Sequence, residues 1–198
     1  MNTRIRTALV GSYAPPEWLI ARHALKTRLP ARIISNEMWR IAPEFLHEAQ
    51  DDAVLSVLAD QEEAGIDIVT DGEVRRESYS APMANAPEGV NRTKHEILVG
   101  RAGKPNRVPL ISAPLKLLKP VHVDDVRFLR AHTKRTVKVT IPGPFTLSQL
   151  ALTDYYQDLE ELAMGYAECV NEEIKSLFAA GADIVQLDEP YLQAKTAE

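Results

Sequence analysis

Hydrophobic residues recur at helical spacing in two long stretches of the chain. In residues 43–64 the apolar positions fall three and four residues apart, and most of the acids lie between them. In residues 154–180 a single apolar stripe is formed by Leu159, Leu162, Tyr166, Cys169, Val170, Ile174, Leu177 and Phe178. A glycine follows each stretch, and glycine commonly ends helices. We therefore expect two long helices that stop at Gly65 and Gly181.

A short apolar strand is expected after each of these helices, at residues 66–70 and 183–187. When the two segments are aligned on their Ala-Gly pairs, they share Ala, Gly, Asp, Ile and Val, and Glu73 falls opposite Glu189. Helix, glycine, strand and terminal carboxylates form the repeating unit of a β/α fold. Such folds carry their chemistry at the carboxyl ends of the strands.

Two further strands complete the pattern. Residues 7–10 form a short apolar run, and residues 136–141 alternate β-branched positions, which is typical of a strand. Helices are expected at residues 16–28 and from Phe145. A complete eight-stranded β/α barrel usually needs about 250 residues. The predicted fold class is therefore α/β, of the (β/α)8 TIM-barrel type, with residues 1–198 as a single domain that covers about the first four β/α units, the N-terminal half.

Residues 77–135 do not follow the β/α spacing. Two strand-like runs, at residues 94–100 and 107–115, flank a turn and predict a β-hairpin. A short helix is expected at residues 124–130, with acids in its first turn. Because an unstructured loop of this length would be unusual, we expect an excursion that covers the rim or one face of the barrel.

Composition narrows the class of protein. The chain has 198 residues and a net charge of −5, which argues against a nucleic-acid partner. It contains no apolar stretch long enough for a membrane span, and its start lacks the apolar core of a signal peptide. One cysteine, Cys169, suits a reducing compartment, and its place in an apolar stripe favours a buried side chain over a ligand. The expected location is the cytoplasm. A half barrel has open sheet edges, so we expect a homo-oligomer or a missing C-terminal half.

The candidate site consists of polar residues where the expected strands end: Ser12, Asp71, Glu73, Arg75, Arg76, Asp188 and Glu189. Carboxylates gathered at one rim can hold an ammonium group, bind a metal, or act as acid and base. The residue pattern leaves these three alternatives open. The five histidines show no metal-ligand spacing, and no glycine-rich phosphate loop is present.

Four motifs together carry a resemblance to a known family: Gly11-Ser12-Tyr13, Asp71-Gly72-Glu73 with the following Val74 and two arginines, the run from Val137 to Pro144, and the run from Val185 to Pro190. In this order they resemble the catalytic domain of cobalamin-independent methionine synthase, and more closely its short forms. The resemblance implies a β/α barrel that moves a methyl group to the thiol of homocysteine, held as a thiolate on zinc. A related branch of the family acts on the thiol of coenzyme M.

The resemblance also implies residue roles. Ser12, Glu73 and Asp188 match the residues that hold the amino-acid part of homocysteine, whereas no catalytic residue is assigned. The family's zinc ligands would lie beyond Glu198, so no metal ligand is expected in this chain. The longer synthases carry a tryptophan after the Pro-Gly-Pro turn that stacks on the folate, and residues 145–149 contain none. The implied methyl donor is therefore a folate or a corrinoid protein.

Three alternatives accompany this interpretation. The first is a thiol alkyltransferase of the coenzyme M type. The second is an enzyme like uroporphyrinogen decarboxylase, in which Arg75 and Arg76 would face an acidic substrate. The third is a catalytically inactive half barrel that serves as an assembly module, because open strand edges favour association.

Overall fold

The structure is a computed structural model that describes residues 4–21, 33–34, 36–99 and 103–195. A parallel sheet lies at its centre, with β1 (Ile68–Val69), β4 (Thr136–Pro142) and β6 (Ile184–Asp188) in the order β1-β4-β6. The expected first strand is reduced to one parallel bridge between Ala8 and Ile68. The α/β class is confirmed. Of the four predicted strands, three form, and the fourth contributes this single bridge.

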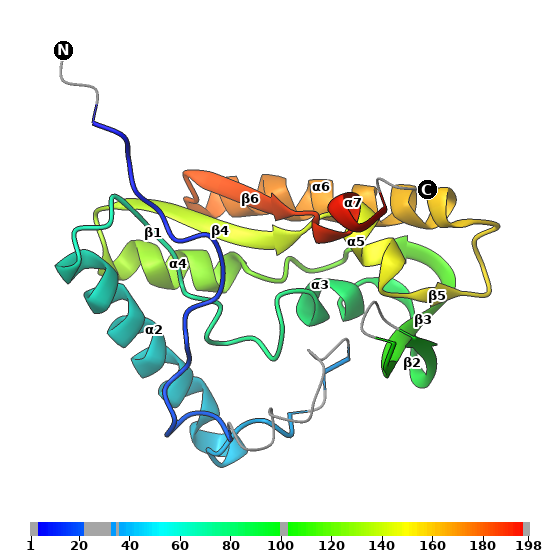
Figure 1. The fold of residues 1–198 in the computed structure, drawn as a ribbon, viewed down its shortest axis with the longest axis horizontal. Coiled ribbons are helices and arrows are strands. Elements are labelled where there is room, and N and C mark those ends of the chain that lie inside the picture. The colour runs from blue at the N-terminus through cyan, green and yellow to red at the C-terminus, as the bar shows by residue number, and fades with distance from the viewer. Residues whose placement is uncertain (1–3, 22–32, 35, 100–102, 196–198) are drawn as a thin grey trace.

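The helices expected from the apolar periodicity pack against the sheet (Figure 1). After the short 3-10 helix η1 (Pro43–Phe45), α2 (Leu46–Glu63) contacts β1. The helix α4 (Val123–His132) contacts β4, and α6 (Leu159–Ala180) contacts both β6 and α4. These helices bury the apolar side of the sheet, which includes Val137, Val139 and Ile141.

The predicted stripe on α6 is mostly buried, but its two end residues, Leu159 and Phe178, are half exposed. The helix begins at Leu159 instead of residue 154, because the Asp158 carboxylate accepts the N–H of Glu161 and caps it. The preceding residues form the short strand β5 (Leu152–Thr153), which the sequence did not predict.

The hairpin is confirmed, with longer strands than expected. The strand β2 (Glu88–Val99) pairs antiparallel with β3 (Pro105–Lys116), and β3 pairs parallel with β5 to form a second sheet. The short helix α3 (Ala81–Asn85) precedes the hairpin. The hairpin lies on the side toward which β4 and β6 point (Figure 1). Within residues 77–135, then, the hairpin stands near the carboxyl ends of the strands, while α4 packs on the sheet.

One local prediction was wrong within the described residues. A helix was expected at residues 16–28, but residues 17–19 form a turn and Ile20 makes an antiparallel bridge with Trp39. The remainder of that predicted helix, from residue 22, lies outside the described residues. After β6 the chain enters the short helix α7 (Pro190–Lys195), with a proline in its first turn. The other short helix, α5 (Pro144–Gln149), starts close to where it was expected. No helix in the described part of the chain is both long enough and apolar enough to cross a membrane.

The aspartate shared by the two repeated segments has the same structural role in both. The Oδ2 atom of Asp67, just before β1, accepts the backbone N–H of Thr7 at 2.8 Å. The Oδ2 atom of Asp183, just before β6, accepts the backbone N–H of Val137 at 2.8 Å. In each case the backbone hydrogen bond is the largest cause of a lowered pKa of the carboxyl group. Each aspartate therefore joins the start of its own strand to the start of the neighbouring one.

Candidate functional site

The loop after β1 turns through two consecutive residues in the left-handed region, Gly72 at φ 63° and Glu73 at φ 59°. Glycine is required at the first position, because a Cβ there would lie 2.7 Å from Val57 and 2.8 Å from Tyr13. Glu73 adopts the conformation despite its side chain. Non-glycine residues in this region often lie at functional sites, where surrounding contacts hold them.

Asp71 and Arg76 supply those contacts. The Oδ1 atom of Asp71 accepts the N–H of Glu73 at 3.1 Å, and its Oδ2 atom accepts a bond from Arg76 at 3.0 Å. Arg76 also donates to the carbonyl oxygen of Thr140 on β4 at 2.6 Å. Both side chains are almost fully buried, at 3% and 2% exposure. The structure thus uses this predicted pair to build the loop and anchor it to the sheet.

Glu73 itself is buried, with 8% of its surface exposed. Burial raises the pKa of its carboxyl group, and the nearby charges of Asp71 and Asp188 raise it further, against the opposing effects of Arg76 and Lys138. The influence of Asp188 on Glu73 means that the carboxylates after β1 and at the end of β6 share one environment. Glu73 and Asp188 therefore lie close enough for their charges to interact.

Ser12 lies beside the same loop. The N–H of the next residue, Tyr13, donates to the carbonyl oxygen of Gly72 at 2.9 Å, so the chain at Ser12 runs alongside the turn that holds Glu73. The Ser12 side chain is exposed. An exposed hydroxyl can donate to or accept from a polar ligand.

Two of the predicted rim residues point elsewhere. Arg75 binds Asp51 at 2.5 Å and lies 3.3 Å from Asp125, with its guanidinium 4.7 Å from the centre of the Phe128 ring. It therefore joins α2 to α4. Glu189 accepts the N–H groups of Phe145 and Thr146 at 2.9 and 2.7 Å, which caps the start of α5. Its partners are distant in sequence, so the charge pattern of the chain could not reveal this role.

Lys138 is a site residue that the sequence reasoning missed. It is buried on β4, with 6% exposure, and its charge acts on Glu73 and Asp188. Its partner Gln186 lies on β6 and donates to Asp188 Oδ1 at 2.8 Å. The available signal was a lysine alternating with valines in the strand expected at residues 136–141. A polar residue at such a position faces the polar side of the sheet.

The described residues do not fit a zinc site. No group of three or more His, Cys, Asp or Glu side chains in the described ranges is arranged to hold a metal ion. Cys169 is buried in α6, and burial raises the pKa of its thiol to about 11. A thiol in this state is a poor ligand, because the thiolate is the form that binds metals.

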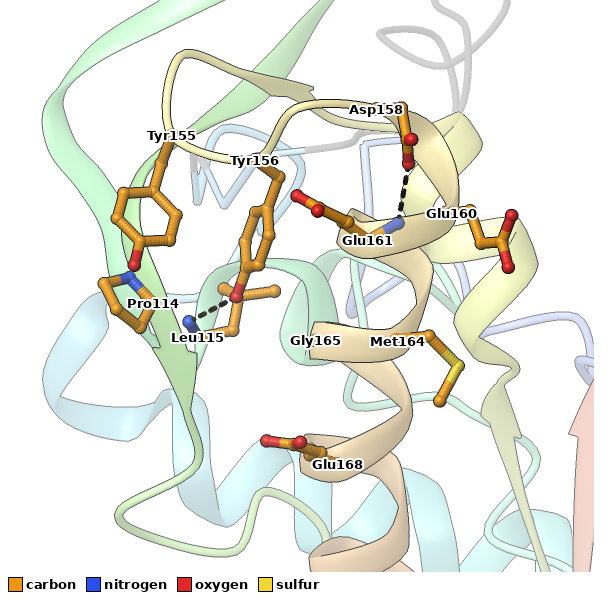
Figure 2. A pocket seen from close by; sticks show the side chains of 10 residues that line it. All are labelled: Pro114, Leu115, Tyr155, Tyr156, Asp158, Glu160, Glu161, Met164, Gly165 and Glu168. Atoms are coloured by element: carbon orange, nitrogen blue, oxygen red, sulfur yellow. Dashed lines mark hydrogen bonds between the residues drawn. The ribbon is translucent and has the colours of Figure 1, made fainter.

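A cavity of about 530 Å³ lies away from these residues, between β3 and the start of α6 (Figure 2). None of the predicted rim residues lines it. Its polar groups include Tyr156, whose hydroxyl accepts the N–H of Leu115 at 2.9 Å, and Asp158, which caps α6. These interactions give the two groups structural roles, and we do not assign the cavity to the site.

The chain was compared with known proteins. Residues 6–197 match the family model described as cobalamin-independent synthase, catalytic domain. The methionine synthase of Sulfurisphaera tokodaii is 34% identical over 193 residues, which cover 97% of this chain and 54% of that protein. The methionine synthase of Sulfolobus acidocaldarius is 32% identical, with 98% of this chain and 54% of that protein covered. The chain thus spans about half the length of these curated relatives.

Solved structures agree with this match. A B12-independent methionine synthase from Shewanella sp. W3-18-1, in complex with selenomethionine, superposes with a TM-score of 0.81 at 35% identity, and the match covers 96% of this chain and 52% of that one. A putative vitamin-B12-independent methionine synthase from Listeria monocytogenes, at 20% identity and a TM-score of 0.70, supports the fold. The family match covers nearly the whole chain. The chain therefore belongs to the cobalamin-independent methionine synthase family, within its catalytic domain.

Proposed function

We propose that this chain carries the amino-acid-binding half of a methyltransferase site that converts homocysteine to methionine. Ser12, Glu73 and Asp188 are the residues proposed to hold the amino-acid part of the substrate. Residues 1–198 are proposed to form the N-terminal half of a (β/α)8 barrel as one domain, with residues 77–135 as an excursion near its rim. The parallel order β1-β4-β6, with the Ala8 bridge beside β1, supports this assignment.

The observation that carries the proposal is a pair of like charges, the buried Glu73 and the partly buried Asp188. Burial is the largest cause of the raised pKa of Glu73, and the negative charge of Asp188 adds to it. An ammonium group between them would remove this repulsion and form charge-assisted hydrogen bonds. The exposed hydroxyl of Ser12 supports binding of the substrate carboxylate on the other side.

The arginines argue against an acidic substrate. Arg76 is paired with Asp71, and Arg75 is paired with Asp51 and Asp125, so both guanidinium groups have partners within the protein. The alternative of an enzyme like uroporphyrinogen decarboxylase depended on those two residues. A carboxylate pair also suits an ammonium-bearing thiol better than the sulfonate of coenzyme M. Selenomethionine in the Shewanella structure is an amino acid of the proposed class.

The proposal also includes a cofactor, a methyl donor and a cellular location. Zinc is the cofactor that the family resemblance implies, and its ligands are proposed to belong to the C-terminal half of the barrel. No step of this proposal passes through zinc. The methyl donor is proposed to be a folate or a corrinoid protein. The cytoplasm is the proposed location, which the single buried cysteine supports.

Calorimetric titration of the chain with L-methionine and L-homocysteine tests the proposal. We expect both amino acids to bind, and we expect Glu73→Gln and Asp188→Asn each to weaken binding by about tenfold or more, because each removes a charge-assisted hydrogen bond. Glu160→Gln makes the same change at an exposed position of α6 and should leave the affinity unchanged.

The titration also separates the alternatives. Equal affinity of the parent chain and both site variants for L-methionine would overturn the proposed residue roles. Binding of coenzyme M in place of either amino acid would favour the thiol alkyltransferase of the coenzyme M type. Binding of neither, together with stable self-association in light scattering, would favour the assembly module.

A further inference from the structure

The buried side chain of Lys138 makes two hydrogen bonds. One reaches the segment before Ser12, and the other reaches Gln186, which binds Asp188. Its ammonium group donates to the carbonyl oxygen of Leu9 and, at 2.5 Å, to Oε1 of Gln186. Burial disfavours the charged ammonium and lowers the pKa of Lys138, while the charges of Asp188 and Glu73 oppose this effect. The two carboxylates therefore favour the cation, which is held at a fixed place by its two acceptors.

Gln186 links Lys138 to Asp188 and thereby orients the Asp188 carboxylate. Its amide oxygen accepts from Lys138, so its amide nitrogen points the other way. That nitrogen donates to the carbonyl oxygen of Val10 and to Oδ1 of Asp188, both at 2.8 Å. With one oxygen of Asp188 bound to the amide, the plane of the carboxylate is restricted.

The same pair also fixes the segment that carries Ser12. Leu9 and Val10 precede the Gly11-Ser12 turn, and each offers its carbonyl oxygen to one member of the pair. This segment has only one β-bridge to the sheet, between Ala8 and Ile68. The contacts from Lys138 and Gln186 are therefore additional attachments just before Ser12.

The formal charges of the site residues also favour one bound ammonium group. Asp71 and Arg76 form a neutral pair, which leaves Glu73, Asp188 and Lys138 with a formal sum of one negative charge. A single ammonium group neutralises that sum. Without Lys138 the sum would be two negative charges, which would favour protonation of Glu73 over its ionised form.

We propose that Lys138, acting through the side-chain amide of Gln186, is a positioning residue that orients Asp188 and the Ser12 segment and matches the charge of the site to one ammonium group. This inference rests on the proposed function, because it assumes an amino-acid ligand. It assigns Lys138 no contact with that ligand.

The first test is the affinity of Lys138→Met for L-methionine, titrated between pH 5 and pH 8. We expect affinity at pH 7 to fall about tenfold, because Asp188 and the Ser12 segment lose the contacts that orient them. We also expect the pH at which binding is half lost on the acid side to move upward. Glu73 would then keep only Arg76 as a favourable cation, against Asp71 and Asp188. A purely structural role for Lys138 would not shift this midpoint.

The second test is Gln186→Met, which removes the amide but keeps the Lys138 charge. We expect weaker binding of L-methionine by about tenfold, with the acid midpoint of the parent chain. Lys119→Met is the matched control, since it removes a lysine charge at an exposed position, and it should bind as the parent chain does.

The outcomes separate this inference from the proposed function. If the folded parent chain binds neither L-methionine nor L-homocysteine, the proposed function fails, and this inference fails with it. If the parent binds and both variants match its affinity and acid midpoint, the inference alone is overturned. If circular dichroism shows that Lys138→Met does not fold, Gln186→Met decides, because parent-like affinity in that variant contradicts the positioning role.

Discussion

The carboxylate of Asp71 binds the backbone N–H of Glu73 at 3.1 Å and thereby holds Glu73 in a left-handed conformation at φ 59°. The other oxygen of Asp71 is bound to the buried Arg76. Asp71, which the sequence placed among the candidate site residues, thus holds the backbone of Glu73. The turn presents Glu73 because Asp71 contacts both the Glu73 N–H and the Arg76 side chain.

Replacing Asp71 with alanine is expected to destabilise the fold strongly. Arg76 would stay buried with its main counter-charge removed, and breaking a buried ion pair in this way typically costs about 3–5 kcal/mol. Urea unfolding followed by circular dichroism measures the change in the free energy of unfolding. Asp124→Ala breaks an exposed ion pair with Arg127 and should have a small effect. Equal losses in the two variants would contradict the structural role of Asp71.

The backbone at Glu73 predicts an unusual order of stability between two variants. Glycine adopts the left-handed region without the strain that a Cβ causes, so Glu73→Gly should be more stable than Glu73→Ala by roughly 1 kcal/mol. At Glu172, an exposed position inside α6, the order should reverse, because alanine favours helices by about 1 kcal/mol over glycine. Urea unfolding of the four variants tests this, and the same order at both positions would contradict the strain at Glu73.

The raised pKa of Glu73 predicts a pH dependence of stability. The folded chain holds this proton more tightly than the unfolded chain, whose glutamate titrates at about pH 4.3. Ionisation of Glu73 therefore destabilises the fold as the pH rises above that value. Glu73→Gln should be more stable than the parent chain at pH 7, and this advantage should vanish at about pH 4 and below. Urea midpoints at the two pH values measure it, and an advantage independent of pH would count against the assignment.

The aspartate before β6 should protect one backbone amide. Asp183→Ala removes the acceptor of the Val137 N–H, so we expect that amide to exchange with deuterium about tenfold faster. The pKa of Asp183 is lowered, so its contribution is present above the unfolded value of about 3.9 and is lost as the pH falls through the lower folded value. Asp154→Ala serves as an unrelated acidic control. Unchanged exchange at Val137 would refute the interaction.

Cys169 should be inert in the folded protein. Burial raises the pKa of its thiol to about 11, so very little thiolate exists at pH 7. We expect an aromatic disulfide reagent to react slowly with the native chain and at the rate of a free thiol in urea. Rapid labelling without denaturant would mean that α6 opens locally, or that this thiol is more accessible than its packing indicates.

Local patterns in the sequence predicted the parts of the fold that depend on local chemistry. The alternation at residues 136–141 became β4, and the apolar stripe of residues 154–180 became most of α6. The repeat at Gly65 and Gly181 located two parallel strands and the carboxylates near their ends. The helix expected at residues 16–28 failed within the described residues, because Ile20 pairs with Trp39 across a long separation in sequence.

The candidate site was predictable as a set of positions, whereas the roles of individual residues were not. Arg75 and Glu189 resemble site residues by their place at strand ends, yet their partners Asp51 and Phe145 are far away in the sequence. Lys138 was not identified because its partners, Leu9 and Gln186, come near it only when β4, β6 and the segment at Leu9 fold together. Pairing across a sheet is a long-range property that no local pattern contains.

The matching bonds of Asp67 and Asp183 lie at the amino ends of the strands, away from the polar rim. A slip of either strand by one residue would break its aspartate bond, so these bonds help to fix the register of the strands. A substitution confined to the rim loops leaves both of these bonds in place.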